Sequence, residues 1–255
     1  MTGMGNEAFS TTGAAPVLVV EGFSKSYGGK KVVDGVSLSV GSGRIFGFVG
    51  PNGAGKTTLI RSIVGALAFD GGDIRICGQS VRTDPVACKR ETAYVPDNPD
   101  VYGFLTGMQY LDYVADLFGV SAGVRAERIP AYAGRLGIGD RLGETASAYS
   151  HGMRQKLVLV GAFLHEPRLL VLDEPFVGLD PEAAYELKAM IREIVSRGSA
   201  VFLSSHVLDT VEKLCDEVAI IRKGAIVRAG SVDEIRGDES LEQVFLEIAR
   251  EARDE

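Results

Sequence analysis

The sequence contains few cysteines and no long apolar run. Its three cysteines, Cys77, Cys88 and Cys215, are odd in number, far apart and without C-x-x-C spacing. We therefore expect free thiols in a reducing compartment and no zinc site. No apolar run approaches the ~18–20 residues of a membrane span, and the first residues lack the basic start and apolar segment of a signal peptide. These absences predict a cytosolic protein that works at a membrane only through a partner.

Positive charge is also scarce. The 255 residues include 27 Lys and Arg against 34 Asp and Glu, which gives a formal net charge of −7. Proteins that bind nucleic acid usually present a basic face, so this balance argues against a nucleic-acid partner. The length is sufficient for one α/β domain with a sizeable core, or for one domain with a small insert.

One glycine-rich stretch matches the phosphate-binding pattern G-x-x-x-x-G-K-[ST]. This P-loop comprises Gly50, Pro51, Asn52, Gly53, Ala54, Gly55, Lys56, Thr57 and Thr58. The apolar run 45–49 before it is typical of a buried strand, and apolar residues at helical spacing follow it. Glycines allow consecutive N–H groups to point at phosphate oxygens, and the positive end of the next helix adds to them. Lys56 then supplies charge for the β- and γ-phosphates, and the Thr57 hydroxyl is a magnesium ligand.

A chance match is the alternative interpretation of this stretch. From average composition, a match should arise by chance in roughly one of a hundred chains of this length. The strand before the loop and the helix after it lower that frequency further. The stretch therefore predicts that the chain binds a nucleotide through its phosphates.

Composition and periodicity divide the chain into a tail, one domain and an extension. Residues 1–16 are small and polar, as in a disordered tail. Residues 17–230 are expected to form a single nucleotide-binding domain, and 231–255 a C-terminal helical extension. Within the domain apolar strands alternate with helices, which predicts a mainly parallel sheet with right-handed crossovers. The expected fold class is α/β, with a P-loop NTPase core.

Two parts of the domain depart from that alternation. The segments around the P-loop are mostly antiparallel strand patterns, so we expect an N-terminal antiparallel β-subdomain. Residues from about 106 to 164 lack strand signals and are expected to form a helical subdomain insert. Thr106 and Gln109 form a capping box at its start, and a second helical stretch is expected to be interrupted near Pro130.

Two acidic residues directly follow a later apolar strand. Residues 169–172 are Leu-Leu-Val-Leu, which is typical of a buried parallel strand, and Asp173 and Glu174 come next. At the carboxyl end of a strand beside the P-loop, Asp173 can hold Mg²⁺ directly or through water. Glu174 is placed to polarise an attacking water. Solvated acids in a loop are the alternative, which so apolar a preceding strand disfavours.

Together with three further segments in fixed order, this strand resembles the ATP-binding cassette (ABC) ATPase family over about residues 17–230. The strand is similar to the family's Walker B motif. The segment Tyr-Ser-His-Gly-Met-Arg-Gln-Lys from Tyr149 resembles its signature motif, more often Leu-Ser-Gly-Gly-Gln. The resemblance implies that four residues of this segment contact the ATP of another subunit: Ser150, His151, Gly152 and Met153. Without the other motifs, an ordinary Ser-Gly helix start would explain the segment equally well.

The two remaining segments resemble the family's D-loop and switch histidine. Asp180, in Gly-Leu-Asp, is expected to cap its own helix, and the resemblance implies that it touches the partner's P-loop. His206, in Ser-Ser-His, would reach the γ-phosphate and hold Glu174 and water in place. Capping alone accounts for an Asp at position 180, and a lone His after a strand is usually a loop residue. Both further roles are therefore implied by the resemblance.

Two weaker correspondences concern Tyr27 and Asp97. Tyr27 resembles the aromatic residue that stacks on adenine, although a surface or core tyrosine is the alternative. Asp97, in Tyr-Val-Pro-Asp, falls in the Q-loop, where the family usually has Gln. The substitution is one methylene shorter and charged. We expect Asp97 to be a metal ligand beside Thr57 and Asp173.

The resemblance implies a subunit that binds and hydrolyses ATP with Mg²⁺, with Glu174 and His206 as catalytic residues. ATP would join two copies, expected to be a homodimer, and separate permease subunits would anchor them at the inner face of the cell membrane. The signature and the Pro-Asp-Asn-Pro loop resemble the branch serving exporter-type, Ecs-like permeases. One alternative is a soluble ABC ATPase acting on ribosomes or DNA, but a coiled coil, zinc-binding cysteines and a second cassette are lacking. Another is a P-loop kinase or GTPase, which the signature and the lack of Asn-Lys-x-Asp disfavour.

Overall fold

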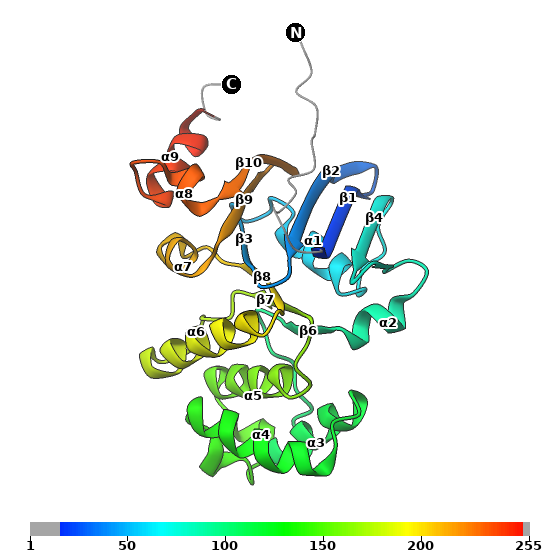
Figure 1. Cartoon of the computed structure of the whole chain (residues 1–255), viewed down its shortest axis with the longest axis vertical. Helices are drawn as coiled ribbons and strands as arrows, with labels where there is room; N and C mark the ends of the chain where they lie inside the picture. The colour runs from blue at the N-terminus through cyan, green and yellow to red at the C-terminus, as the bar shows by residue number, and fades with distance from the viewer. Residues whose placement is uncertain (1–15, 252–255) are drawn as a thin grey trace.

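The computed structural model describes residues 16–251, which form two β-sheets and a set of helices (Figure 1). The tail predicted for 1–16 lies outside the described residues except for Pro16, which begins the first strand. Residues 252–255 of the predicted C-terminal extension also lie outside them.

One sheet has four antiparallel strands in the order β2-β1-β4-β5, which confirms the predicted antiparallel β-subdomain. Its strands are β1 (Pro16–Tyr27), β2 (Lys30–Gly41), β4 (Gly71–Ile76) and β5 (Gln79–Ser80). The first two are longer than their apolar patterns predict. Gly28 and Gly29, with φ of 56° and 81°, make a tight turn, so pairing continues as far as Tyr27 and Lys30.

The second sheet has six strands in the order β10-β9-β3-β8-β7-β6. Its strands are β3 (Ile45–Val49), β6 (Thr92–Val95), β7 (Leu169–Asp173), β8 (Ala200–Ser204), β9 (Glu217–Arg222) and β10 (Ala225–Ser231). All neighbouring pairs are parallel except β9 with β10. The predicted mainly parallel sheet is therefore confirmed, with an antiparallel hairpin at one edge.

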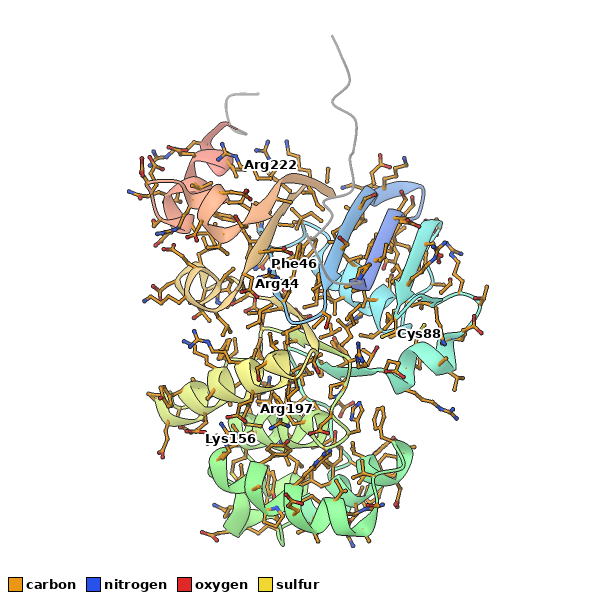
Figure 2. All side chains as sticks on the ribbon, in the orientation of Figure 1. Arg44, Phe46, Cys88, Lys156, Arg197 and Arg222 are labelled. Atoms are coloured by element: carbon orange, nitrogen blue, oxygen red, sulfur yellow. The ribbon has the colours of Figure 1, made fainter. Side chains whose placement is uncertain are left out.

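The parallel strands divide their side chains between two hydrophobic cores. Phe46 and Phe202 stack with ring centroids 5.8 Å apart in a core shared with the antiparallel sheet, and Phe46 lies near the centre of the molecule (Figure 2). The alternate neighbours Ile45 and Val201 face a larger core shared with the helices. Because adjacent side chains of a strand point to opposite faces, a run buried on both faces has no polar positions. Each fully buried side chain of this size contributes roughly 1.5–3 kcal/mol.

Helices pack around the parallel sheet, and between β6 and β7 the chain has helices but no strand. Outside that segment the helices are α1 (Lys56–Ile63), α2 (Pro85–Arg90), α6 (Pro181–Ser196), α7 (Leu208–Leu214), α8 (Val232–Arg236) and α9 (Leu241–Glu251). Between β6 and β7 the chain forms α3 (Gly107–Leu117), α4 (Ala122–Arg135), the short 3-10 helices Gly139–Arg141 and Ala146–Ala148, and α5 (His151–Phe163). Figure 1 shows α3, α4 and α5 together at the bottom of the molecule.

The capping box of Thr106 and Gln109 begins α3 as predicted, but the interruption predicted near Pro130 is absent. Pro130 lies exposed inside a continuous α4. Its missing N–H costs one intrahelical bond. Buried Ile129 and Ala133 on either side hold the two halves of the helix against the core.

A hairpin turn joins both sheets to the P-loop. The turn lies between β9 and β10, where Arg222 pairs with Ala225. The Gly224 N–H donates to the Ala54 carbonyl at 3.1 Å, and the Gly224 carbonyl accepts from the Asp34 N–H at 3.0 Å. Asp34 belongs to β2, so three distant segments meet here.

None of the helices within residues 16–251 has the length and apolar character that a membrane span requires.

Candidate nucleotide site

Residues predicted to bind the nucleotide, to bind the metal and to catalyse hydrolysis lie at the carboxyl ends of four neighbouring parallel strands. The P-loop follows β3, His206 follows β8, Asp173 ends β7 and Asp97 follows β6. These strands are adjacent in the order β3-β8-β7-β6, so residues far apart in the sequence reach one edge of the sheet. Ligands of open parallel sheets bind at this edge.

The P-loop backbone requires glycine at two of its positions. A Cβ on Gly50 would collide with the main-chain carbonyl of Ile221, and Gly55 has a φ of 110°. The Lys56 ammonium group turns back over the loop and donates to the carbonyls of Gly50, at 2.5 Å, and Pro51, at 3.1 Å. Two main-chain carbonyls of the loop therefore hold the Lys56 ammonium group beside the N-terminal end of α1.

Opposing influences act on the Lys56 ammonium group. Burial lowers the pKa of Lys56, and the nearby Glu174 and Asp173 carboxylates offset part of that decrease. Thr57 lies exposed in the first turn of α1, where no acidic residue is present. The positive end of α1 and the lysine are thus available to the same ligand.

Glu174 and His206 form a close pair beside the loop. Glu174 Oε2 lies 2.9 Å from His206 Nδ1, and the Glu174 N–H donates to the Ser204 carbonyl at 2.9 Å. Glu174 has a φ of 50°, a left-handed conformation that costs energy in a residue with a side chain. Its side chain is 18% exposed, whereas that of His206 is 63% exposed. The pair therefore presents a partly buried carboxylate beside an accessible imidazole.

Asp173 is buried, and the acidic groups around it change its titration. Burial raises its pKa to about 6, and the charges of Asp97 and Glu174 raise it as well. Asp97 itself is exposed, and its carboxylate accepts from the Asn98 N–H at 2.9 Å. A cation that reached this edge would be attracted by all three carboxylates.

The predicted metal ligands suit magnesium bound together with a nucleotide. Among residues 16–251, no group of three or more His, Cys, Asp and Glu side chains is arranged to hold a metal ion. The predicted set has one hydroxyl, of Thr57, and two carboxylates, of Asp97 and Asp173. Mg²⁺ usually binds one or two carboxylates and completes its shell with phosphate oxygens and water. The residues therefore fit this ion.

The signature segment and Asp180 form a second, separate group. Ser150 caps α5, because its hydroxyl accepts from the Met153 N–H at 3.2 Å. A Cβ on Gly152 would collide with the carbonyl of Gly178, so the segment that resembles the D-loop packs directly on the signature. Asp180 caps α6 as predicted, and its other oxygen lies 2.5 Å from Lys156 Nζ of α5.

The P-loop group contains a cavity that the signature segment does not line. The cavity measures about 300 Å³, and its lining residues are Gly50, Pro51, Asn52, His206, Leu208 and Phe245. Phe245, from α9, was not predicted as a site residue. Its helical spacing with Leu241 and Val244 was visible in the sequence, but that spacing does not tell where the helix packs.

Tyr27 ends β1 with its side chain half exposed. It is 49% exposed, and the ammonium group of Lys25 lies 5.4 Å from its ring centroid. An accessible ring face suits stacking on a planar base, so the role on adenine stays a prediction. The three cysteines are free, as predicted, with Cys77 exposed and the other two buried.

Comparison with known proteins finds one family model, curated relatives and solved structures that are similar to this chain. The family model described as ABC transporter matches residues 33–177. The ABC-type transporter ATP-binding protein EcsA of Bacillus subtilis is 33% identical over 240 residues, covering 92% of this chain and 97% of that protein. The Nod factor export ATP-binding protein I of Ralstonia nicotianae is 33% identical over 223 residues, covering 88% and 70%. A solved structure of an ATP-binding subunit of an ABC transporter is 34% identical with a TM-score of 0.88, covering 91% and 99%.

Proposed function

The chain belongs to the ABC transporter family, and from this premise we propose how its residues bind ATP, hydrolyse it and meet their partners. As a member of this family it is an ATPase that uses ATP with Mg²⁺ to power transport. The relatives described above are transporter proteins, so the alternative of a non-transport role on ribosomes or DNA has no support.

The phosphates of ATP bind in the P-loop. Its main-chain N–H groups, the end of α1 and Lys56 offset the phosphate charge, and Thr57, Asp173 and Asp97 would hold Mg²⁺. The ion, when bound, neutralises charge that develops on the phosphate oxygens. Tyr27 is proposed to stack on the adenine.

Hydrolysis converts ATP and water to ADP and phosphate, and the Glu174–His206 pair is the observation that supports the proposed roles. Glu174 orients the attacking water and accepts its proton as the bond to the γ-phosphorus forms. His206, hydrogen-bonded to Glu174 at 2.9 Å, keeps that carboxylate in place and reaches toward the γ-phosphate. Such sites act by positioning and charge neutralisation.

A second copy of the chain completes the site. The signature segment and Asp180 are joined to each other and do not line the cavity beside the P-loop. We expect the N-terminal end of α5, with Ser150 and Gly152, to meet the γ-phosphate of ATP held by the partner. Two identical sites then form in a homodimer related by twofold symmetry.

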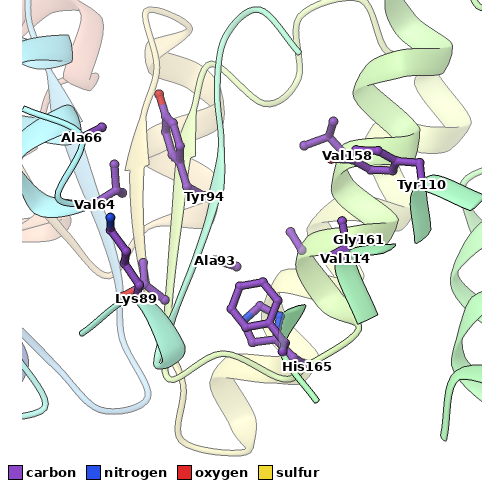
Figure 3. A pocket seen from close by; sticks show the side chains of 13 residues that line it. Val64, Ala66, Lys89, Ala93, Tyr94, Tyr110, Val114, Val158, Gly161 and His165 are labelled. Carbon is purple, nitrogen blue, oxygen red and sulfur yellow. The ribbon is translucent and has the colours of Figure 1, made fainter. Parts of the chain in front are cut away.

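The permease is proposed to dock in a pocket between the sheet and the helices α3 and α5. This docking pocket measures about 370 Å³ (Figure 3), and its lining residues are Val64, Ala66, Lys89, Thr92, Ala93, Tyr94, Tyr110, Val114, Phe118, Val158, Gly161, Ala162 and His165. Most are apolar, and burial raises the pKa of Tyr110 to about 12. An apolar cytoplasmic segment of the permease with an acidic group opposite Lys89 fits this lining.

Export is the proposed direction of transport. The support is the similarity to a relative whose name states export and to EcsA. The subunit would then lie on the cytoplasmic face of the cell membrane, held there through its permease.

Glu174→Gln tests the catalytic assignment. The variant should bind ATP as the wild type does, lose hydrolysis by at least about 100-fold and elute as an ATP-dependent dimer in size-exclusion chromatography. Glu127→Gln, an exposed change of the same chemistry on α4, is the matched control. Full hydrolysis by Glu174→Gln would refute the assignment, and a monomer at saturating ATP would refute the shared site.

Val114→Glu tests the docking pocket. Placed among apolar residues, the charge should prevent co-purification with a multi-span membrane protein from detergent-solubilised membranes, while ATP hydrolysis by the isolated subunit continues. Val227→Glu, on exposed β10, is the control and should leave co-purification intact. Equal recovery of the membrane protein with both variants would exclude this pocket as the docking site.

A further inference from the structure

The C-terminal helix α9 reaches the cavity beside the P-loop. It buries Leu241, Val244 and Ile248 on one face, with at most 5% of each side chain exposed. Phe245 is half-buried and lines the cavity of about 300 Å³ opposite Gly50 and the other P-loop residues. His206 lines the same cavity, so an apolar ring from the end of the chain lies beside two parts of the catalytic site.

At its N-terminal end, α9 is attached to the helix that follows His206. The Leu241 N–H donates to Glu212 Oε2 at 2.8 Å, and Arg236 Nη1 lies 3.8 Å from the other carboxylate oxygen. Glu212 belongs to α7, which begins at Leu208, two residues after His206. A buried amide at a helix start is thereby satisfied by a residue of α7.

At its C-terminal end, α9 is attached to the strand that supports the P-loop. Arg222 Nη1 donates to the Ile248 carbonyl at 2.6 Å. Arg222 ends β9, which pairs in parallel with β3, the strand leading into the P-loop. The Ile221 carbonyl is the group that excludes a side chain at Gly50.

We propose that α9 positions His206 relative to the P-loop, with Phe245 and Glu212 as positioning residues for ATP hydrolysis. The inference rests on the proposed catalytic role of His206. The helix joins β9 to α7, and Phe245 lines the cavity that the P-loop and His206 also line. Replacing Phe245 by a small residue enlarges this cavity and lets α7 and His206 shift. ATP binding remains, because the P-loop is formed by β3 and α1.

The test compares single-turnover ATP hydrolysis with equilibrium ATP binding in the full chain. Phe245→Ala should slow hydrolysis about tenfold, as expected for a slightly misplaced catalytic group, and leave the Kd for ATP within about twofold. Phe245→Leu, which keeps most of the volume, should restore most of the rate. Glu247→Ala, at an exposed position of the same helix, is the control and should match the wild type.

A double-mutant cycle separates positioning from general loosening of the fold. If Phe245 acts through His206, then Phe245→Ala should cause no further loss in a His206→Ala background. Glu212→Ala should behave like Phe245→Ala, whereas Glu212→Gln, which still accepts from the Leu241 N–H, should stay near the wild-type rate. Thermal unfolding of each variant identifies any that do not fold, and the Leu and Gln variants then decide the outcome.

Three results would overturn the inference. Equal rates for Phe245→Ala and the wild type would remove the role of α9 while leaving the proposed function intact, provided that His206→Ala is slow. The same fractional loss with and without His206 would show that Phe245 acts independently of it. A folded wild-type chain without hydrolysis would refute the proposed function and this inference together.

Discussion

Lys156 Nζ lies 2.5 Å from Asp180 Oδ2, and this ion pair joins α5, which begins at the signature, to the segment that begins α6. Asp180 also accepts from the Ala183 N–H at 2.9 Å, so one carboxylate both caps a helix and bridges to its neighbour. The two segments proposed to meet a partner's ATP are therefore held as one unit. The helix cap alone accounts for an Asp at position 180. The ion pair with Lys156 attaches the helix of the signature segment to it.

Variants of Asp180 should separate the cap from the ion pair. Asp180→Asn keeps a good cap and should cost a few tenths of a kcal/mol, whereas Asp180→Ala should cost about 1 kcal/mol in urea unfolding. Lys156, with the Ala183 amide, lowers the pKa of Asp180. The ionised Asp180 carboxylate therefore adds to the free energy of unfolding at pH values above the unfolded pKa of about 3.9. This stabilisation is lost as the pH falls below that value. Equal stability of the Asn and Ala variants would contradict the cap.

Lys56→Ala should weaken ATP binding by about 10–100-fold, because a charge-assisted contact to phosphate contributes about 1.5–3 kcal/mol. The rise in melting temperature that ATP produces in the wild type should shrink accordingly. Lys89→Ala removes an equal charge outside the P-loop and serves as the control. Unchanged ATP affinity in Lys56→Ala would count against the phosphate-binding role.

Asp97→Asn should raise the Mg²⁺ concentration needed for half-maximal hydrolysis. The amide keeps an oxygen acceptor for the Asn98 N–H, so the turn survives while the charge is removed. Asp97→Gln gives the residue expected at this position and should shift the requirement in the same direction. The measurement is a magnesium titration at fixed ATP. An unaltered titration in both variants would exclude Asp97 as a metal ligand.

His165→Phe should reduce the sensitivity of the fold to acid. Burial lowers the pKa of His165 to about 4, and its ring stacks on Phe118 with centroids 3.6 Å apart. Because the unfolded chain binds a proton at higher pH, the wild type loses stability as pH falls from about 6.5 toward 4. The phenyl ring keeps the stack and avoids this loss, on the order of 1–2 kcal/mol at pH 5 after allowance for partial exposure. Parallel stability curves for the two proteins would contradict this account.

The fold was predictable where burial leaves a pattern in the sequence. Residues 169–172 are apolar throughout because both faces of the strand are covered, and Asp180 and Thr106 cap helices by contacts within three residues. The continuation of β1 to Tyr27 was not predicted, since its outer part is polar and is held by pairing with β2 and by the distant Asp70 carboxylate.

The candidate site was predictable from motifs that act through local backbone geometry. Glu174 and His206 are 32 positions apart in the sequence. They meet because their strands, β7 and β8, are neighbours that end at the same edge of the sheet. The packing of Gly178 on Gly152 and the place of Phe245 depend on contacts between distant elements. Neither a local pattern nor a helical period contains that information.

The hydrogen bonds from Gly224 to Ala54 and from Asp34 to Gly224 have a consequence for cooperativity. They connect the loop that is proposed to bind the ligand to strands of both sheets. Local unfolding of either sheet should therefore disturb the loop. Nucleotide binding should therefore slow amide hydrogen exchange at Asp34 and Gly224 together, although neither is expected to touch the ligand. The P-loop thus connects the two sheets, and a bound nucleotide should raise the hydrogen-exchange protection of both.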